Sequence, residues 1–222
     1  MSVPRKKHVY VEMIGDFSSP CSWCGKRQLE KVVLSNECQE QYTIQVRHLP
    51  FVCNPSLPEA EELQTMTPPN LPPPFPPQVL RSALRVGLGN TVFRANNLAR
   101  SASTLQSHCL LKFCEQTEPN LKIQSLLADL LYSSFLGNGN YPTMTNIVEH
   151  ARAVGLDATQ ARLFLESREE EGLVRSEVDQ YAKLGVQQLP FFILNGKAMF
   201  AGCQEHAVIM RALEECPYST DY

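Results

Sequence analysis

Hydrophobic and polar residues alternate from His8 to Ile14, a period of two that is typical of a half-buried strand. Asp16 to Pro20 interrupt this alternation, and the spacing of an amphipathic helix then runs from about Cys21 to Asn36. Tyr42 to Leu49 returns to the strand pattern. The three segments predict a β-α-β unit, whose two strands pair in parallel through a right-handed crossover.

A long stretch without strands follows. Most of the sixteen prolines lie between Pro50 and Pro77, and we expect a surface loop there because proline is excluded from helix interiors and central strands. From about Gln78 to Leu184 the pattern is helical almost throughout. Breaks in this helical block fall at four short segments: Gly87 to Asn90, Glu118 to Asn120, Gly137 to Tyr141 and Gly155 to Asp157.

The chain then returns to the strand pattern. Phe191 to Asn195 and Ala198 to Ala201 flank the turn Asn195-Gly196 and predict a β-hairpin, and Glu205 to Glu215 predicts a last amphipathic helix. Strand, helix, strand, helical block, hairpin and helix is the order of a thioredoxin core interrupted after its second strand.

The predicted class is therefore α/β, a thioredoxin-like fold with a helical domain inserted between the second strand and the C-terminal β-hairpin. The predicted limits are 1–56 with 185–222 for a discontinuous thioredoxin-like domain, 57–77 for a Pro-rich connector and 78–184 for the inserted all-helical domain.

Composition and charge limit the classes of partner that the protein is expected to bind. A net charge of -3 and a pI near 6.0 disfavour a nucleic-acid partner, which needs a basic face. The first residues lack the apolar core of a secretory signal, and no stretch is long enough to span a membrane. We therefore expect a cytoplasmic protein without a membrane partner, whose eight cysteines are mostly free thiols.

Cys21 and Cys24 form a CxxC pair in the first turn of the predicted first helix. Unpaired backbone N–H groups there favour a thiolate and can lower the pKa of a cysteine, which is the chemistry of thiol-disulfide exchange. A zinc site would need a second pair of ligands, and because no second CxxC or HxxxH is present we predict no metal. The remaining cysteines are interpreted as small buried hydrophobes: Cys38, Cys53, Cys109, Cys114, Cys203 and Cys216.

Leu189 and Pro190 directly precede the hairpin. A proline at that place suggests a cis peptide bond, which would turn the backbone of Leu189 towards the CxxC pair and a bound substrate. Trp23, inside the CxxC motif, either packs beneath the helix or lines the substrate surface.

The segment from Asp16 to Glu30, DFSSPCSWCGKRQLE, resembles the active-site segment of the DsbA-like family, and of its FrnE-like branch in particular. The resemblance extends over nearly the whole chain. Further similarity lies in Leu49-Pro50-Phe51 with Asn54-Pro55, Gly155-Leu156-Asp157, Gly185-Val186, Leu189-Pro190-Phe191-Phe192-Ile193, Asn195-Gly196 and Gly202-Cys203-Gln204.

One departure from that pattern affects the site. FrnE-like proteins read Asp-x-x-Cys-Pro-x-Cys-x-x-Gly-Lys-Arg, and an alignment without gaps puts Ser19 at the nucleophilic cysteine and Ser22 at its partner. The CxxC of this chain lies two residues later. The register suits helix chemistry, because serine is a favoured N-cap and Pro20 would follow it as the first helical residue.

The same register is similar to a sister branch, the kappa-class glutathione transferases and 2-hydroxychromene-2-carboxylate isomerases, whose motif reads Asp-x-x-Ser-Pro-x-Ser-x-x-Gly. That resemblance implies that the Ser19 hydroxyl would hydrogen-bond the thiolate of glutathione, with Ser22 beside it. The alternative for Ser19 is a plain helix cap.

Three functions follow as hypotheses. The first is a DsbA-family thiol-disulfide oxidoreductase, working as a reductase or isomerase on thiol- or disulfide-containing substrates, with Cys21 as nucleophile, Cys24 resolving and Pro190 shaping the groove. The second is a glutathione-dependent transferase or isomerase. In it, Ser19 would hydrogen-bond the thiolate of glutathione, the cosubstrate, and a small electrophile would be the other substrate. The third is a non-catalytic binding or chaperone-like module. No bound cofactor is expected, and the sequence leaves open whether the protein forms a homodimer.

Overall fold

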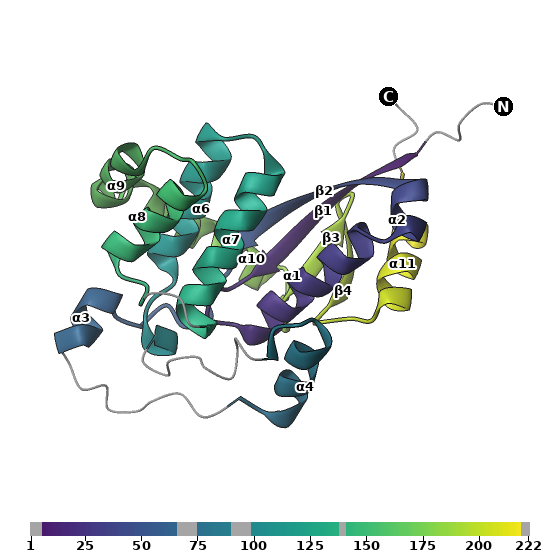
Figure 1. The fold of residues 1–222 in the computed structure, drawn as a ribbon, viewed down its shortest axis with the longest axis horizontal. Coiled ribbons are helices and arrows are strands. Elements are labelled where there is room, and N and C mark those ends of the chain that lie inside the picture. The colour runs from purple at the N-terminus through teal and green to yellow at the C-terminus, as the bar shows by residue number, and fades with distance from the viewer. Residues whose placement is uncertain (1–5, 66–74, 90–98, 138–140, 219–222) are drawn as a thin grey trace.

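A four-stranded mixed sheet lies at the centre of the chain in the computed structural model (Figure 1). The structure describes residues 6–65, 75–89, 99–137 and 141–218. The strands are β1 (Lys7–Gly15), β2 (Tyr42–Pro50), β3 (Phe191–Leu194) and β4 (Lys197–Ala201), in the order β2-β1-β3-β4. β1 and β2 pair in parallel, and the hairpin of β3 and β4 joins β1 antiparallel.

Alternate residues of β1 face a core that two helices cover, α1 (Pro20–Val33) and α11 (His206–Glu215). Val9, Val11 and Met13 are buried there, whereas Tyr10 between them is exposed, as the period of two predicts. The side chains that complete this core from the helices and the hairpin are Leu29, Val32, Phe192, Ile209 and Leu213.

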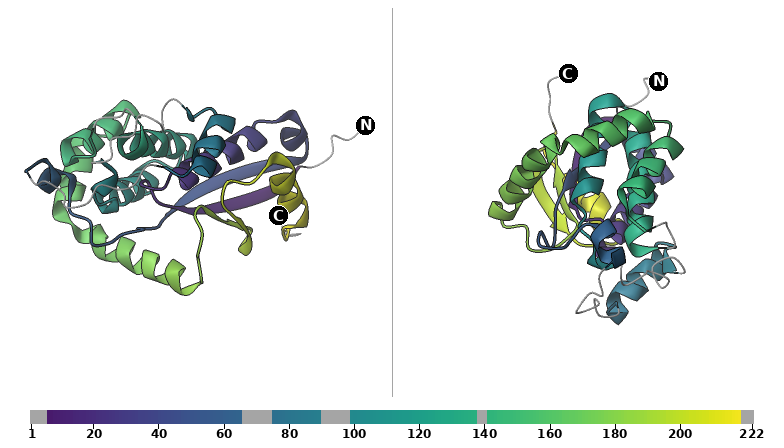
Figure 2. Two further views of the ribbon diagram at one scale, coloured as in Figure 1. Left: turned by 90° about the horizontal axis from the view of Figure 1, so that it is seen from below. Right: turned by 90° about the vertical axis from the view of Figure 1, so that its left-hand side faces the viewer.

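A second core lies within the helices between β2 and β3. A short helix, α2 (Asn36–Gln41), precedes β2. The inserted helices are α3 (Ala60–Thr65), α4 (Pro77–Arg85), the 3-10 turn η1 (Ala99–Ser101), α6 (Leu105–Thr117), α7 (Leu121–Leu136), α8 (Met144–Ala153), α9 (Ala158–Ser167) and α10 (Glu169–Lys183). Helices α6 to α9 gather at the end of the sheet opposite to α2 and α11 (Figure 1 and Figure 2).

The α/β fold with helices inserted between the second strand and the hairpin agrees with the prediction. The turn Asn195-Gly196 joins β3 to β4, and both of its residues have positive φ, 48° and 78°, as a two-residue hairpin requires. In the described part of the chain, no helix combines the length and the apolar character needed to cross a membrane.

The prediction of a loop from Pro50 to Pro77 was wrong in part. β2 runs to Pro50, and α3 lies in the proline-free stretch that follows Pro58. The physical reason is burial, since Ala60 and Leu63 are each 3% exposed against the helical core. Residues 66–74, with further prolines of that segment, lie outside the described residues.

Two helix boundaries also differ from the prediction. The first helix ends at Val33, because Ser35 caps α2 by accepting a hydrogen bond from the backbone N–H of Cys38. A break at Arg168 separates α9 from α10 without a glycine or proline, since Arg168 itself takes the left-handed conformation at φ 56°.

Candidate active site

The site begins at the turn from β1 into α1. Ser19 is the N-cap of α1, and its hydroxyl accepts a hydrogen bond from the backbone N–H of Ser22 at 3.2 Å. Pro20 takes the first helical position, where its missing N–H has no consequence. Cys21 and Cys24 therefore lie one helical turn apart on the same side of α1.

The buried carboxylate of Asp16 stabilises this turn through hydrogen bonds. Asp16 accepts hydrogen bonds from the backbone N–H of Cys53 at 2.7 Å and from the Ser18 hydroxyl at 2.9 Å, and its Oδ1 lies 3.7 Å from Nε2 of the buried His108. Burial on its own would raise the pKa of the Asp16 carboxyl, but His108 and the N–H of Cys53 together lower it below its ordinary value. The carboxylate thus holds the segment that carries Ser19.

Ser22 points into the protein rather than to a substrate. Its side chain is fully buried, and its hydroxyl accepts a hydrogen bond from the backbone N–H of Asp16 at 3.3 Å. The predicted substrate-binding role of Ser22 does not fit this position.

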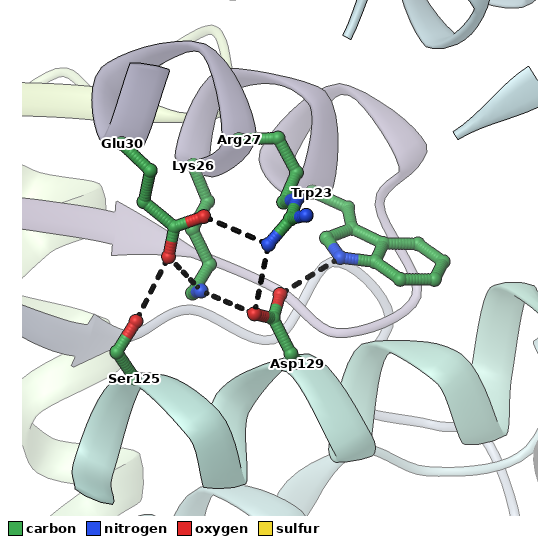
Figure 3. A network of polar contacts seen from close by, with 6 residues as sticks. All are labelled: Trp23, Lys26, Arg27, Glu30, Ser125 and Asp129. Atoms are coloured by element: carbon green, nitrogen blue, oxygen red, sulfur yellow. Dashed lines mark hydrogen bonds and ion pairs between the residues drawn. The ribbon is translucent and has the colours of Figure 1, made fainter. Parts of the chain in front are cut away.

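Trp23 is also buried, so of its two predicted roles the structure shows packing. Its ring stacks on Tyr132 of α7 with 5.9 Å between ring centroids, and its indole N–H donates to Asp129 Oδ1 at 3.1 Å (Figure 3). A tryptophan in the CxxC motif therefore anchors α1 on the inserted helices and does not line a substrate surface.

A buried lysine joins the same two helices (Figure 3). The side chain of Lys26 is 2% exposed, and its ammonium lies 2.5 Å from Glu30 and 3.0 Å from Asp129. Arg27 bridges the same two carboxylates, at 3.0 Å and 3.2 Å, and the Ser125 hydroxyl of α7 donates to Glu30 at 2.9 Å. Each charge of the network thus has a partner, as a buried ion pair requires.

The two thiols of the CxxC differ in access. Cys21 is half-buried, whereas Cys24 is completely buried and packs in the helical core. Cys21 is therefore the more accessible of the two thiols. Cys24 lies behind it, as the sequence predicts.

The predicted low pKa of these thiols was wrong. Burial raises the pKa of Cys21, and it raises that of Cys24 to about 12, with further contributions from the neighbouring thiols of Cys203 and Cys21. Near Cys24, Arg85 acts in the opposite direction and is outweighed. The physical reason is desolvation, because a buried thiolate loses the water that stabilises its charge.

Pro190 lies directly against α1. The Leu189–Pro190 peptide bond is cis, Pro190 is buried, and Leu189 is half-buried. A Cβ added to Gly25 would lie 2.3 Å from Cγ of Pro190, so only glycine lets the helix approach the ring this closely. The carbonyl of Pro190 accepts the backbone N–H of Gly202 at 2.7 Å. The structure thus brings the CxxC helix and the predicted proline together.

The remaining cysteines fit the prediction of buried hydrophobes in part. Cys38, Cys109, Cys114 and Cys216 are buried, but Cys53 is exposed and Cys203 is half-buried, and all eight cysteines are free. Cys203 packs beside the core that contains Cys24. The sequence signal that could have found it is its position after Gly202, directly behind the hairpin that Pro190 begins.

Within the residues that the structure describes, no group of three or more His, Cys, Asp or Glu side chains is arranged to hold a metal ion.

Gly25→Ala should destabilise the protein by about 1 to 3 kcal/mol, because the new methyl group overlaps the ring of Pro190. Gly172→Ala is the matched control, since Gly172 lies in α10 with open space around it, and it should be stabilising by about 0.5 to 1 kcal/mol. Urea unfolding measures both changes. Equal stability of the two variants would contradict the close approach of α1 to Pro190.

Asp129→Ala should lower the free energy of unfolding by about 3 kcal/mol, because the buried ammonium of Lys26 then keeps only Glu30 as a partner. Arg152→Ala, which removes an exposed ion pair with Glu149 on α8, should change it by less than about 1 kcal/mol. Thermal and urea unfolding compare the two variants. A change in Asp129→Ala no larger than in the control would show that the network does not clamp the helices.

Cys21 in the folded protein should react with iodoacetamide more slowly at neutral pH than the same cysteine in urea-unfolded protein. Its raised pKa leaves a smaller thiolate fraction, and thiolate is the reactive form. The rate should grow about tenfold for each pH unit and still be rising above the ordinary thiol pKa. Peptide mass spectrometry at a series of pH values measures it, and a plateau near neutral pH would contradict the raised pKa.

Comparison with known proteins agrees with this geometry. A family model, DSBA-like thioredoxin domain, matches residues 10–214. The probable DsbA oxidoreductase SCO1869 from Streptomyces coelicolor is 22% identical, with a TM-score of 0.67 over 95% of this chain and 92% of that one. No curated protein matches the chain significantly.

Two further solved structures have the same fold at lower identity. A 2-hydroxychromene-2-carboxylate isomerase is 14% identical, with a TM-score of 0.62 over 92% of this chain and 94% of that one. The cytosolic disulfide reductase DsbM from Pseudomonas aeruginosa is 12% identical, with a TM-score of 0.57 over 85% and 86%. Because the family model covers nearly the entire chain, this protein belongs to the DsbA-like thioredoxin family.

Proposed function

We propose that the protein is a thiol-disulfide oxidoreductase in which Cys21 exchanges with the substrate and Cys24 resolves the intermediate. The observation that carries the proposal is the pairing of a half-buried thiol at the second position of α1 with a fully buried thiol one turn behind it. Family membership and the oxidoreductases among its structural neighbours support the class of chemistry.

The exchange has two steps. The Cys21 thiolate attacks one sulfur of a substrate disulfide, which forms a mixed disulfide and releases the other substrate sulfur as a thiolate. The Cys24 thiolate then attacks Cys21, which releases the second substrate sulfur and leaves a Cys21–Cys24 disulfide. Two molecules of an external thiol such as glutathione return two electrons to the protein by the same exchange and leave as their disulfide. Pro190, packed against α1, would shape the groove that receives the substrate.

The reductase or isomerase direction agrees with the electrostatics of the thiols. Strongly oxidising pairs of this family stabilise their reduced form as a thiolate of low pKa. Here burial raises the pKa of Cys21 and Cys24, so that the reduced form gains no such stabilisation. A more reducing couple follows, and the neighbour DsbM, a cytosolic disulfide reductase, is consistent with that direction.

The geometry of Ser19 supports a second candidate, a glutathione-dependent transferase or isomerase. The hydroxyl of Ser19 accepts the N–H of Ser22 and is half-buried, so it keeps its own proton to donate to a glutathione thiolate. The isomerase neighbour and a DsbM structure with glutathione support this candidate. In that reaction a small electrophile would be the second substrate.

Single substitutions separate the two candidates. Cys21→Ser should reduce catalysed reduction of a disulfide substrate by glutathione to the uncatalysed rate, because the attacking thiolate is gone. Ser19→Ala should keep most of that activity while losing about 1 kcal/mol of stability through the cap. Cys38→Ala, in the sheet core, is the control for loss of a cysteine remote from the site.

The opposite pattern would overturn the oxidoreductase proposal in favour of the second candidate. In that case Ser19→Ala would abolish conjugation or isomerisation with glutathione, and Cys21→Ser would be fully active. A wild-type protein inactive in both assays would exclude both and leave the non-catalytic module.

A further inference from the structure

A third thiol stands beside the CxxC pair. Cys203 lies two residues after the end of β4, and its half-buried side chain packs against the core cluster that contains Cys24 and Trp23. It comes from the segment behind the C-terminal hairpin, nearly 180 residues further along the chain than Cys24. The two-step exchange described above makes no use of it.

Pro190 is the common neighbour of the two segments. Gly25, the residue after Cys24, lies against the proline ring, and Gly202, the residue before Cys203, donates its N–H to the proline carbonyl at 2.7 Å. The backbones that carry Cys24 and Cys203 therefore meet at one residue. A disulfide between them would join two segments that are already held together.

The electrostatic coupling of the thiols agrees with this proximity. A charge on Cys203 raises the pKa of Cys24 more than a charge on Cys21 does, and Cys21 and Cys203 are both half-buried. Because such an effect falls with distance, Cys203 lies near enough to Cys24 for their charges to interact. A charge on Cys21 also raises the pKa of Cys203.

Two basic residues act electrostatically on Cys203. Arg85 of α4 lowers the pKa of both Cys24 and Cys203, and Lys31 of α1 lowers that of Cys203. The ammonium of Lys31 donates to the carbonyl of Arg85 at 2.9 Å, which ties α4 to α1 beside the thiols. Neither cation acts on Cys21, where burial alone shifts the pKa. Burial still raises the pKa of Cys203, and the two cations offset part of that rise.

We propose that Cys203 is a third redox-active thiol of the site. It exchanges with the Cys21–Cys24 disulfide, so that a Cys24–Cys203 disulfide forms and Cys21 is released. The Cys203 thiolate attacks the sulfur of Cys24, one S–S bond forms as another breaks, and Cys21 leaves as a thiolate. No oxidant or reductant is consumed. The role rests on the proposed oxidoreductase function, because it begins from the CxxC disulfide.

The exchange gives the oxidised protein a free nucleophile. A protein that stores its disulfide between Cys24 and Cys203 keeps Cys21 as a thiol that can attack a further substrate disulfide. Such a state suits isomerisation, in which a free enzyme thiolate opens a substrate disulfide and another substrate thiol later releases it, without net electron transfer.

The test uses the full-length Cys21→Ala variant, which cannot form the CxxC disulfide. The variant is incubated with glutathione disulfide, free thiols are trapped with an alkylating agent, and disulfide-linked peptides are mapped by mass spectrometry. One glutathione disulfide accepts two electrons from Cys24 and Cys203 and yields two glutathione molecules. We expect a Cys24–Cys203 linkage and two fewer alkylated thiols than in the reduced variant.

Two double variants complete the design. Cys21→Ala with Cys203→Ala should lose the linkage, and Cys21→Ala with Cys38→Ala should keep it, because Cys38 lies in the sheet core away from the site. Circular dichroism and a melting curve verify that all variants fold. Cys203 that stays reduced, or carries only glutathione, in folded Cys21→Ala would overturn the inference.

Wild-type protein separates this failure from that of the proposed function. A Cys21–Cys24 linkage in wild type without a Cys24–Cys203 linkage in Cys21→Ala would refute the role of Cys203 and leave the oxidoreductase intact. If Cys21→Ala forms the Cys24–Cys203 linkage but the wild-type protein does not exchange with substrate disulfides, the proposed function is refuted, although the two thiols pair.

Discussion

The ion pair between Lys26 of α1 and Asp129 of α7 connects the two parts on which the site depends. α1 belongs to both cores, since Leu29 packs on the sheet and Trp23 packs on the inserted helices. A lysine that is 2% exposed has to be paired, and of its two partners Glu30 lies on α1 itself, whereas Asp129 comes from the insertion. The position of the CxxC relative to Pro190 therefore depends on helices that lie between β2 and β3 in the chain.

The same packing explains the chemistry of the thiols. Because α1 is held between the sheet and α7, its first turn loses solvent, and this loss raises the pKa of Cys21 and Cys24. A helix start in water would favour the thiolate, whereas this one is covered. Burial likewise raises the pKa of Cys203, although Arg85 of α4 and Lys31 of α1 offset part of that rise.

Local sequence patterns predicted much of the fold and the backbone segments that carry the site. The alternation in β1, the turn at Asn195 and the Ser19-Pro20 cap depend on neighbouring residues, and each element lies where its pattern indicates. α3 did not follow from local signals, since its stability comes from burial against distant helices. The break at Arg168 also has no glycine or proline to announce it.

What the sequence could not predict in the site depends on contacts across long separations. The burial of Ser22 and Trp23, the sign of the pKa shift at Cys21 and the approach of Cys203 all follow from α7 or the hairpin meeting α1. The cysteines of the motif look alike in the sequence. Only the packed structure distinguishes an accessible thiol from a buried one.

The central claim is that Cys21 and Cys24 form a working redox pair. The most direct test is the equilibrium of purified wild-type protein in glutathione buffers of graded potential, with free thiols trapped and linkages mapped by mass spectrometry. The account predicts a reversible Cys21–Cys24 disulfide with a reducing midpoint. Thiols that stay reduced over the whole range while glutathione binds would contradict it and make Ser19 the centre of the site.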